Sequence, residues 1–302
     1  MKELVVISGK GGTGKTSVVA ALAALAENKL LADCDVDAAN LHLVLKPRIR
    51  QREDFSGGKC AWITPEACTA CGECLEICRY DAVRMTDVGG EKTFRIDPLA
   101  CEGCGVCAHF CPTEAIVFAP VVNGQWFVSD TRHGPLIHAR LNAGGENSGR
   151  LVTLIRQQAH KIAEDQNLAL VIVDGSPGIG CPVIASLTGA DLALVVTEPT
   201  LAGIHDFGRI TALTNHFSVP VVLCINKWDL NPELTQRLEQ EAHQRQISVV
   251  GRVRYSPAFT QAQRNGISVV EYDGESAGED LSALWQNLKP LVTEDELTLK
   301  LL

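Results

Sequence analysis

The chain of 302 residues lacks several features that would fix its class. It contains no run of 18 apolar residues, which argues against a membrane-spanning helix. Its first residues lead directly into an apolar segment, without a basic stretch or a cleavage site, so we expect a cytoplasmic location. The net charge is −9, and an acidic chain has no general affinity for nucleic acid. We therefore expect neither a membrane span nor a nucleic-acid partner.

The C-terminal segment 291–302 also lacks a basic amphipathic helix. It carries Glu294, Asp295 and Glu296 against a single lysine. Peripheral proteins that bind membranes through a terminal helix need a cationic face on that helix. The sequence therefore predicts no membrane partner.

The segment Ser8–Thr16, with the sequence SGKGGTGKT, is the strongest local motif near the start. It follows the apolar run Leu4–Ile7 and precedes an Ala/Leu-rich helix pattern at Ser17–Ala26. This strand–glycine turn–helix context is typical of a P-loop. Lys15 is expected to reach the β- and γ-phosphates, and Thr16 to bind Mg²⁺ through its hydroxyl. The other predicted nucleotide-binding residues of this segment are Gly9, Gly11, Gly12, Thr13, Gly14 and Ser17.

Lys10 adds a second lysine just before the paired glycines. The resulting KGGxGKT sequence resembles the deviant Walker A motif of the MinD/ParA family. That resemblance implies that Lys10 reaches across a homodimer to the nucleotide of the partner chain. The alternative is a solvated lysine at a loop tip.

Acidic residues follow two of the expected strands. Asp33, Asp35 and Asp37 come directly after the apolar run Leu30–Ala32 and resemble the second-strand motif of MinD/ParA ATPases. Carboxylates at such strand ends can bind Mg²⁺ through water or orient an attacking water. We expect Asp35 or Asp37 to position the water, and the spacing leaves open which one.

Asp174 ends the apolar run Leu168–Val173 and is followed by Gly175-Ser176-Pro177-Gly178. An aspartate at the end of a buried strand occupies the Walker B position, where it holds Mg²⁺ through water. The Asp-x-x-Pro-Gly sequence resembles the switch II loop of MinD-like ATPases.

The twelve cysteines are clustered, which favours metal ligation over disulfides. Two runs follow the C-x₂-C-x₂-C-x₃-C spacing of bacterial ferredoxins, in which the fourth cysteine ligates the other cluster. We expect two 4Fe–4S clusters; zinc is the alternative, but it usually takes pairs of C-x₂-C. The predicted ligands are Cys68, Cys71, Cys74 and Cys111 for the first cluster, and Cys101, Cys104, Cys107 and Cys78 for the second.

Other cysteines and histidines have no companions at metal-ligand spacing. Cys60 is expected to be a small buried apolar residue, and His133 and His138 to be hydrogen-bonded loop residues. Cys181 follows Asp174 by seven residues, as does a cluster-ligating cysteine in the nitrogenase iron protein. A third cluster, shared between two chains at Cys181, therefore remains a minor alternative.

Apolar runs alternate with helical patterns along most of the chain. This alternation predicts a doubly wound, parallel α/β sheet. The charged segment Pro47–Gly58 indicates a boundary, Asn123-Gly124 predicts a hairpin turn, and residues 131–149 are expected to form a loop. We therefore expect a P-loop ATPase domain in two parts, 1–56 and 121–302, with a small α+β two-cluster ferredoxin-like domain inserted at 57–120.

The strand Val219–Ile225 ends in Asn226-Lys227-Trp228-Asp229. This N-K-x-D sequence is the guanine-reading motif of GTPases. In MinD-like ATPases an asparagine at this strand end contacts adenine instead. The resemblance elsewhere favours ATP, and GTP stays open.

Nearly the whole chain resembles MinD-superfamily P-loop ATPases that carry an inserted ferredoxin domain. The resemblance implies a homodimer with nucleotide at its interface and a Mg²⁺-dependent ATPase that cleaves the β–γ phosphoanhydride bond. We expect an ATP-dependent electron donor that passes electrons through two clusters to a redox protein. The alternatives are an ATPase that assembles iron–sulfur or metal cofactors, and one whose clusters only stiffen the insert. The lack of a surplus C-x₂-C pair favours electron transfer.

Overall fold

The computed structural model describes residues 1–142 and 147–293. By its internal contacts the chain divides into two compact units. The large unit comprises residues 1–53, 126–140 and 148–302, and the cysteine unit comprises residues 54–125 and 141–147. The charged residues 294–296, on which the expectation about the C-terminal segment partly rests, lie outside the described residues.

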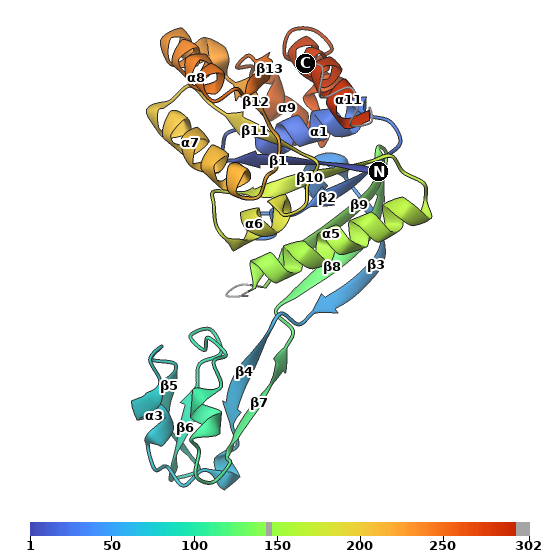
Figure 1. Cartoon of the computed structure of the whole chain (residues 1–302). Coiled ribbons are helices and arrows are strands. Elements are labelled where there is room, and N and C mark those ends of the chain that lie inside the picture. Colours follow the sequence, from blue (N-terminus) through green and yellow to red (C-terminus); the bar gives the residue numbers. More distant parts are fainter. Residues whose placement is uncertain (143–146, 294–302) are drawn as a thin grey trace. The chain divides into compact units, whose positions relative to one another are not determined.

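The large unit is built around a nine-stranded sheet (Figure 1). Six neighbouring strands, from β13 at one edge to β2, pair in parallel, and β9 also pairs in parallel with β2. The predicted parallel α/β sheet is therefore confirmed. In spatial order the strands are β13 (Ser248–Val253), β12 (Val221–Asn226), β11 (Leu192–Thr197), β1 (Lys2–Ser8), β10 (Leu170–Pro177), β2 (Lys29–Asp33), β9 (Gly134–Leu141), β8 (Gly124–Thr131) and β3 (Arg48–Phe55).

Helices cover both faces of this sheet, as parallel sheets require. One face carries α1 (Lys15–Leu25), α2 (Leu41–Leu45), α9 (Ala258–Asn265), α10 (Val269–Tyr272) and α11 (Ala277–Thr293). The other carries α5 (Ser148–Asp165), α6 (Cys181–Leu187) and α7 (Leu201–His216). Helix α8 (Pro232–Gln244) packs on β13, and a short 3₁₀ helix, η2 (Trp228–Leu230), precedes it.

Strand β1 shows why these residues form a central strand. Leu4 and Val6 are fully buried in the core shared with α1 and α11. Val5 and Ile7 are also fully buried, and because side chains alternate along a strand they face the opposite layer. A strand that is apolar on both sides can lie only between two helical layers.

The cysteine unit is small and has two antiparallel strand pairs. Strand β4 (Gly58–Ile63) pairs with β7 (Ile116–Val121), and β5 (Val83–Val88) pairs with β6 (Glu91–Ile96). The 3₁₀ helix η1 (Pro65–Ala67), α3 (Glu73–Ile77) and α4 (Val106–His109) lie between the strands. Its buried core consists of a few apolar side chains and one cysteine: Ala61, Cys74, Ala82, Val83, Phe94, Ile96 and Ile116.

The charged segment after Pro47, interpreted above as a boundary, contains β3, an edge strand whose residues are exposed except Phe55. Two local predictions were wrong. The expected loop 131–149 contains β9, whose central residues are buried, and the start of α5. Asn123-Gly124 does not close a hairpin, because β7 pairs with β4, whereas β8 lies in the large sheet.

Among the described residues, no helix is both long and apolar enough to cross a membrane.

Candidate functional site

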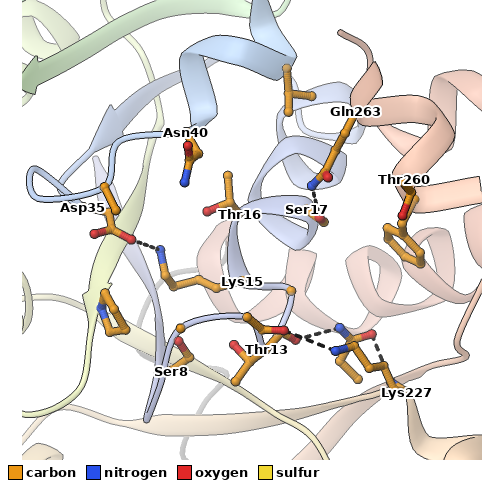
Figure 2. Close-up of a pocket in the computed structure, with 18 of the residues that line it drawn as sticks. Ser8, Thr13, Lys15, Thr16, Ser17, Asp35, Asn40, Lys227, Thr260 and Gln263 are labelled. Carbon is orange, nitrogen blue, oxygen red and sulfur yellow. Dashed lines mark hydrogen bonds and ion pairs between the residues drawn. The ribbon is translucent and has the colours of Figure 1, made fainter. Parts of the chain in front are cut away.

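A cavity of about 690 Å³ opens where β1 and β12 end and α1 begins (Figure 2). Its volume lies in the range of small-molecule sites. The P-loop residues 11–17 line one side of it. Doubly wound sheets bind ligands at this edge, outside the carboxyl ends of the strands. The cavity is therefore the candidate nucleotide site.

Gly14 shows why the loop needs glycine at this position. Its φ is 91°, and an added Cβ would lie 2.2 Å from Asn226 Nδ2. That amide donates a hydrogen bond to the Thr13 carbonyl at 2.7 Å, and Asn226 Oδ1 accepts one from the Lys227 N–H at 3.0 Å. Asn226, the predicted nucleotide contact, therefore lines the cavity. Its side-chain nitrogen and oxygen are both hydrogen-bonded to the protein backbone.

Lys15 is the buried cation of the site. Its ammonium forms ion pairs with Asp174 and, at 3.5 Å, with Asp35, the pair drawn in Figure 2. Burial of Lys15 disfavours its charge, but the carboxylates of Asp174 and Asp35 outweigh burial and raise its pKa. Lys15 therefore stays protonated, ready to bind phosphate oxygens.

The three aspartates after β2 have different surroundings. Asp33 is fully buried, and its carboxylate accepts hydrogen bonds from the N–H groups of Asp35 and Leu41 at 3.1 and 3.3 Å. Burial and the neighbouring Asp174 raise the pKa of Asp33 to about 8. Asp35 lines the cavity, whereas Asp37 is exposed and does not. Asp33 thus holds the loop, and Asp35 faces the site.

Asp174 and Thr16 offer the oxygen atoms that Mg²⁺ prefers. Asp174 is fully buried, and its Oδ2 has no hydrogen-bond partner among the described residues. Buried polar atoms normally have a partner, so an unsatisfied carboxylate oxygen fits a hydrated cation. Thr16 lines the cavity, whereas Asp174 does not line it and is joined to it by its ion pair with Lys15. These residues fit the magnesium ion that the sequence predicts.

Lys10, unlike Lys15, contacts an acidic residue outside the cavity. Its ammonium forms an ion pair with Glu198 at 2.6 Å, and Lys10 does not line the cavity of its own chain. Lys227 binds the same carboxylate at 3.1 Å and donates to the Gly12 carbonyl at 3.2 Å. Although burial opposes it, hydrogen bonds from Lys10 and Lys227 hold the pKa of Glu198 below its usual value. Glu198 therefore forms ion pairs with two lysines at the edge of the P-loop.

Sequence reasoning missed the far wall of the cavity. Residues 254–256 after β13 line it, together with Phe259, Thr260 and Gln263 of α9. Gln263 donates a hydrogen bond to the Ser17 hydroxyl at 3.1 Å (Figure 2). The proline at 257, just before a polar helical segment, signals a helix start and was the available clue.

Asp229, the aspartate of the N-K-x-D sequence, holds the backbone of a neighbouring segment. Asp229 Oδ1 accepts a hydrogen bond from the Tyr255 N–H at 2.7 Å, and Asp229 does not line the cavity. Guanine recognition would need this carboxylate to face the base. The geometry therefore favours adenine over guanine.

The eight cysteines of the two runs surround two further cavities in the cysteine unit. Each cavity is lined by the three closely spaced cysteines of one run and the last cysteine of the other. The first is lined by Cys68, Cys71, Cys74 and Cys111, and the second by Cys78, Cys101, Cys104 and Cys107. These are the two sets that ferredoxin spacing predicts.

The described residues contain no group of three or more His, Cys, Asp or Glu side chains that converges on one metal ion. Four thiolates around a 4Fe–4S cluster each bind a different iron atom, so they surround a space instead of meeting at one point. A single zinc ion, in contrast, needs four ligands that converge tetrahedrally.

The loops beside the second cavity are tightly fitted. Gly103 has φ of 61°, and an added Cβ would lie 2.2 Å from the Lys59 carbonyl of β4. Cys60, the next residue of β4, is buried, as expected, but it lies beside Cys101. Burial and this neighbouring cysteine raise the pKa of Cys60 to about 11.

The remaining candidates lie outside these sites. His133 contacts Glu271 at 3.2 Å, and His138 is buried in β9 with Nε2 2.9 Å from the Ser129 hydroxyl. Burial lowers the pKa of His138 to about 4. Cys181 is exposed at the start of α6.

Comparisons with known proteins agree with this fold. Residues 4–269 match the CobQ/CobB/MinD/ParA nucleotide-binding domain. The uncharacterized protein MJ0578 of Methanocaldococcus jannaschii is 34% identical over 233 residues, covering 76% of this chain and 79% of that protein.

Among solved structures, the Pyrococcus furiosus cell division ATPase MinD aligns with a TM-score of 0.56 and 17% identity, over 96% of this chain and 99% of that chain. The Pyrococcus horikoshii septum site-determining protein MinD, in complex with Mg-ADP, gives a TM-score of 0.56 and 16% identity, over 96% of each chain. These likenesses show the fold. With the family match and the P-loop cavity, they establish that the chain belongs to the CobQ/CobB/MinD/ParA family of nucleotide-binding proteins.

Proposed function

We propose that this protein is a Mg²⁺-dependent ATPase whose nucleotide site controls electron transfer through two 4Fe–4S clusters in the cysteine unit. The observation that carries the proposal is the pairing of a P-loop cavity in one unit with two four-cysteine cavities in the other. A chain that only hydrolysed ATP would have no need of the second feature.

The nucleotide site supports hydrolysis of the β–γ bond through its own residues. The P-loop N–H groups and the α1 N-terminus offer a cradle for phosphate oxygens. Lys15 supplies a positive charge to the β- and γ-phosphates, while Thr16 and Asp174 would hold Mg²⁺, which neutralises developing charge. Asp35 faces the cavity and is the better candidate of the two to orient the attacking water.

The segment that follows Asp174 is suited to report the state of the nucleotide. The Gly178 N–H donates a hydrogen bond to the Ser8 carbonyl at 2.8 Å, so this segment touches the residue that begins the P-loop. It leads directly into α6, which packs on α5. A change at the γ-phosphate therefore has a short route into these helices.

In the cysteine unit, the proposed domain is a two-cluster, ferredoxin-like insert of the residues 57–120. The thiolates would bind iron, and the clusters, once bound, would each carry one electron at a time. Cys71 and Cys104 are exposed, which supports exchange of electrons with a redox protein.

We also propose that two chains form a homodimer with nucleotide at the interface, in which Lys10 leaves Glu198 for the partner's nucleotide. Lys10→Ala should weaken ATP-dependent dimerisation, measured by light scattering with a non-hydrolysable ATP analogue. Lys161, an exposed lysine of α5, provides the matched control variant Lys161→Ala. A Lys10→Ala dimer as tight as the wild-type dimer would contradict this role.

The second candidate is a cofactor-assembly ATPase. The exposed Cys181 at the start of α6 is the observation that favours it, because a thiol next to the switch segment could hold a cluster between two chains. Iron in excess of the content of two clusters per chain, lost in Cys181→Ser, would support this candidate.

The experiment that tests the first proposal is a measurement of coupling. The anaerobic, reduced protein is studied by EPR with and without Mg²⁺-ATP, and Lys15→Ala is the control that cannot respond to nucleotide. The proposal predicts that ATP changes the spectrum or the potential of the clusters in the wild type alone. Cluster signals that ignore ATP would contradict nucleotide control.

A further inference from the structure

A single arginine holds the short helix α2 against the rest of the large unit. Arg132 lies in the turn between β8 and β9. Its guanidinium donates hydrogen bonds to the carbonyls of Val44 and Leu45, the last two residues of α2, at 3.2 and 3.1 Å. It also donates two hydrogen bonds to the carboxylate of Glu271 in α10, at 2.7 and 2.8 Å. Arg132 therefore joins the end of α2 to α10.

Helix α2 depends on contacts of this kind for its position. It has only five residues, and so short a helix is not stable by itself. The N–H of its first residue, Leu41, donates to the Asp33 carboxylate at 3.3 Å, while Arg132 holds its other end. The ammonium of Lys46, the residue after α2, donates to the Asn265 carbonyl at the end of α9 at 2.6 Å. Helix α2 is thus held at both ends.

The position of α2 matters because α2 and the loop before it form one wall of the nucleotide cavity. Asp35 and Asn40 of this loop line the cavity (Figure 2), as does Val44 of α2 itself. Asp33 links the loop to the helix, since its carboxylate accepts the N–H of Asp35 as well as that of Leu41. A shift of α2 would therefore move both the wall and Asp35.

The other end of this connection lies on the phosphate side of the site. Helix α10 packs on α1, the helix that follows the P-loop and begins with Lys15. Glu271 is itself fixed, because its carboxylate accepts the Ser268 N–H at 2.8 Å in the capping box of α10. Two parallel hydrogen bonds between an arginine and a carboxylate also fix the geometry of the pair. Arg132 thus sets the wall that carries Asp35 relative to the P-loop.

Hydrolysis of ATP depends on this relation. The oxygen of the attacking water forms a bond to the γ-phosphorus while the bond from that phosphorus to the bridging oxygen breaks, which gives ADP, inorganic phosphate and a proton. A misplacement of about 1 Å can lower the rate roughly 100-fold. Nucleotide binding depends on the relation less, because the P-loop supplies most of the phosphate contacts.

We propose that Arg132 is a positioning residue for ATP hydrolysis, which acts on the attacking water through α2 and Asp35. The inference rests on the proposed function, since it requires hydrolysis at the P-loop site. Arg132 does not line the cavity, so it is not a catalytic residue. It sets where Asp35 lies when water attacks, and it should therefore affect kcat more than KM.

The test measures the ATPase kinetics of the full-length protein and combines Arg132→Met with Asp35→Asn. Methionine keeps an unbranched apolar side chain and removes the five donors of the guanidinium. We expect Arg132→Met to lower kcat roughly 10- to 100-fold and to change KM by less than about threefold. Arg237→Met, which changes an exposed arginine of α8, is the matched control and should leave both constants unchanged.

The double variant separates positioning from a general loss of stability. If Arg132 acts through Asp35, Arg132→Met should cost little in a chain that already carries Asp35→Asn. The kcat values of the double variant and of Asp35→Asn should then agree within about threefold. A role in stability alone would give losses that multiply.

Two further variants keep the inference testable where Arg132→Met does not fold. Arg132→Lys keeps the positive charge but lacks the planar fork that reaches two carbonyls and a carboxylate, so it should retain only part of the wild-type kcat. Glu271→Gln leaves Arg132 in place and weakens its anchor. It should lower kcat severalfold, with the same lack of additivity towards Asp35→Asn.

Two results would overturn the inference: a wild-type kcat in these variants of Arg132 and Glu271, or losses that multiply when they are combined with Asp35→Asn. Wild-type protein that binds ATP without hydrolysing it would instead contradict the proposed ATPase activity. The two failures are therefore distinguishable.

Discussion

The two units of this protein achieve stability in different ways. The large unit buries continuous apolar strands such as β1 between two helical layers, and its ligand site lies at the edge of that core. The cysteine unit has few buried apolar residues, and Cys74 is one of its core side chains. Domains of about 70 residues seldom bury enough apolar surface to be stable without a metal or cross-links. Under the proposed function, ATP binds to a unit that is already folded, whereas iron contributes to the folding of the unit that binds it.

Removal of iron should have the largest effect, and this effect should separate the cysteine unit from the large unit. Because metal binding and folding are coupled in small metal-binding domains, the cluster-free protein should lose structure in residues 57–120 and become open to proteases there. The large unit should stay resistant and keep its ATP affinity. Limited proteolysis with mass spectrometry, before and after chelation, measures both. A cysteine unit that resists proteolysis equally well without iron would contradict this difference.

Lys15→Ala tests whether the large unit can be changed without an effect on the cysteine unit. Loss of the buried cation should lower ATP hydrolysis by roughly 100-fold or more, as for other groups that stabilise charge in a transition state. Iron content should not change, because Lys15 belongs to the large unit. Phosphate release and iron analysis on the same sample give both values, with Lys161→Ala as control. A loss of iron in Lys15→Ala would mean that the units are not independent.

Asp35→Asn and Asp37→Asn test which aspartate of the large unit positions the attacking water. Asp35 lines the cavity and Asp37 does not, so Asp35→Asn should lower kcat by roughly 10- to 100-fold and Asp37→Asn much less. Nucleotide affinity, measured by calorimetry, should be similar in both. The reverse order of kcat values would assign the water-positioning role to Asp37.

The smallest effect is expected from Glu271→Gln, which probes how the large unit holds α2. Hydrogen bonds from Arg132, stronger than the opposing burial, lower the pKa of Glu271 to about 2. Arg132 also donates to the carbonyls of Val44 and Leu45 at the end of α2.

A lowered carboxyl pKa stabilises the fold above the unfolded value of about 4.5, and this contribution is lost as the pH falls towards 2. Glu271→Gln should therefore lower the thermal midpoint at pH 7, with a difference that shrinks below pH 4.5. A difference independent of pH would contradict the ion-pair explanation.

Much of this structure could be predicted from the sequence because the strongest signals are local. Buried parallel strands are continuous apolar runs, and Lys15 and Asp174 follow two of them. The two groups of four cysteines that line the cavities of the cysteine unit are those that ferredoxin spacing predicts.

Features that depend on distant neighbours could not be predicted in this way. Strand β3 is charged and exposed, and only its place at the sheet edge makes it a strand. Strand β9 begins with a Gly-Pro pair that favours a loop, yet it pairs with β2. The cavity wall at Phe259 likewise arises from tertiary packing.

One measurement tests the central claim, that the cysteine unit holds two clusters, most directly. Iron and acid-labile sulfide are determined per chain in anaerobically reconstituted protein, and the reduced sample is studied by EPR. The account predicts eight iron atoms and eight sulfides, with the signature of two interacting 4Fe–4S clusters. It also predicts that Cys78→Ser damages the second site, although Cys78 belongs to the first cysteine run. Zinc in place of iron, or a Cys78→Ser variant that loses only the first cluster, would contradict it.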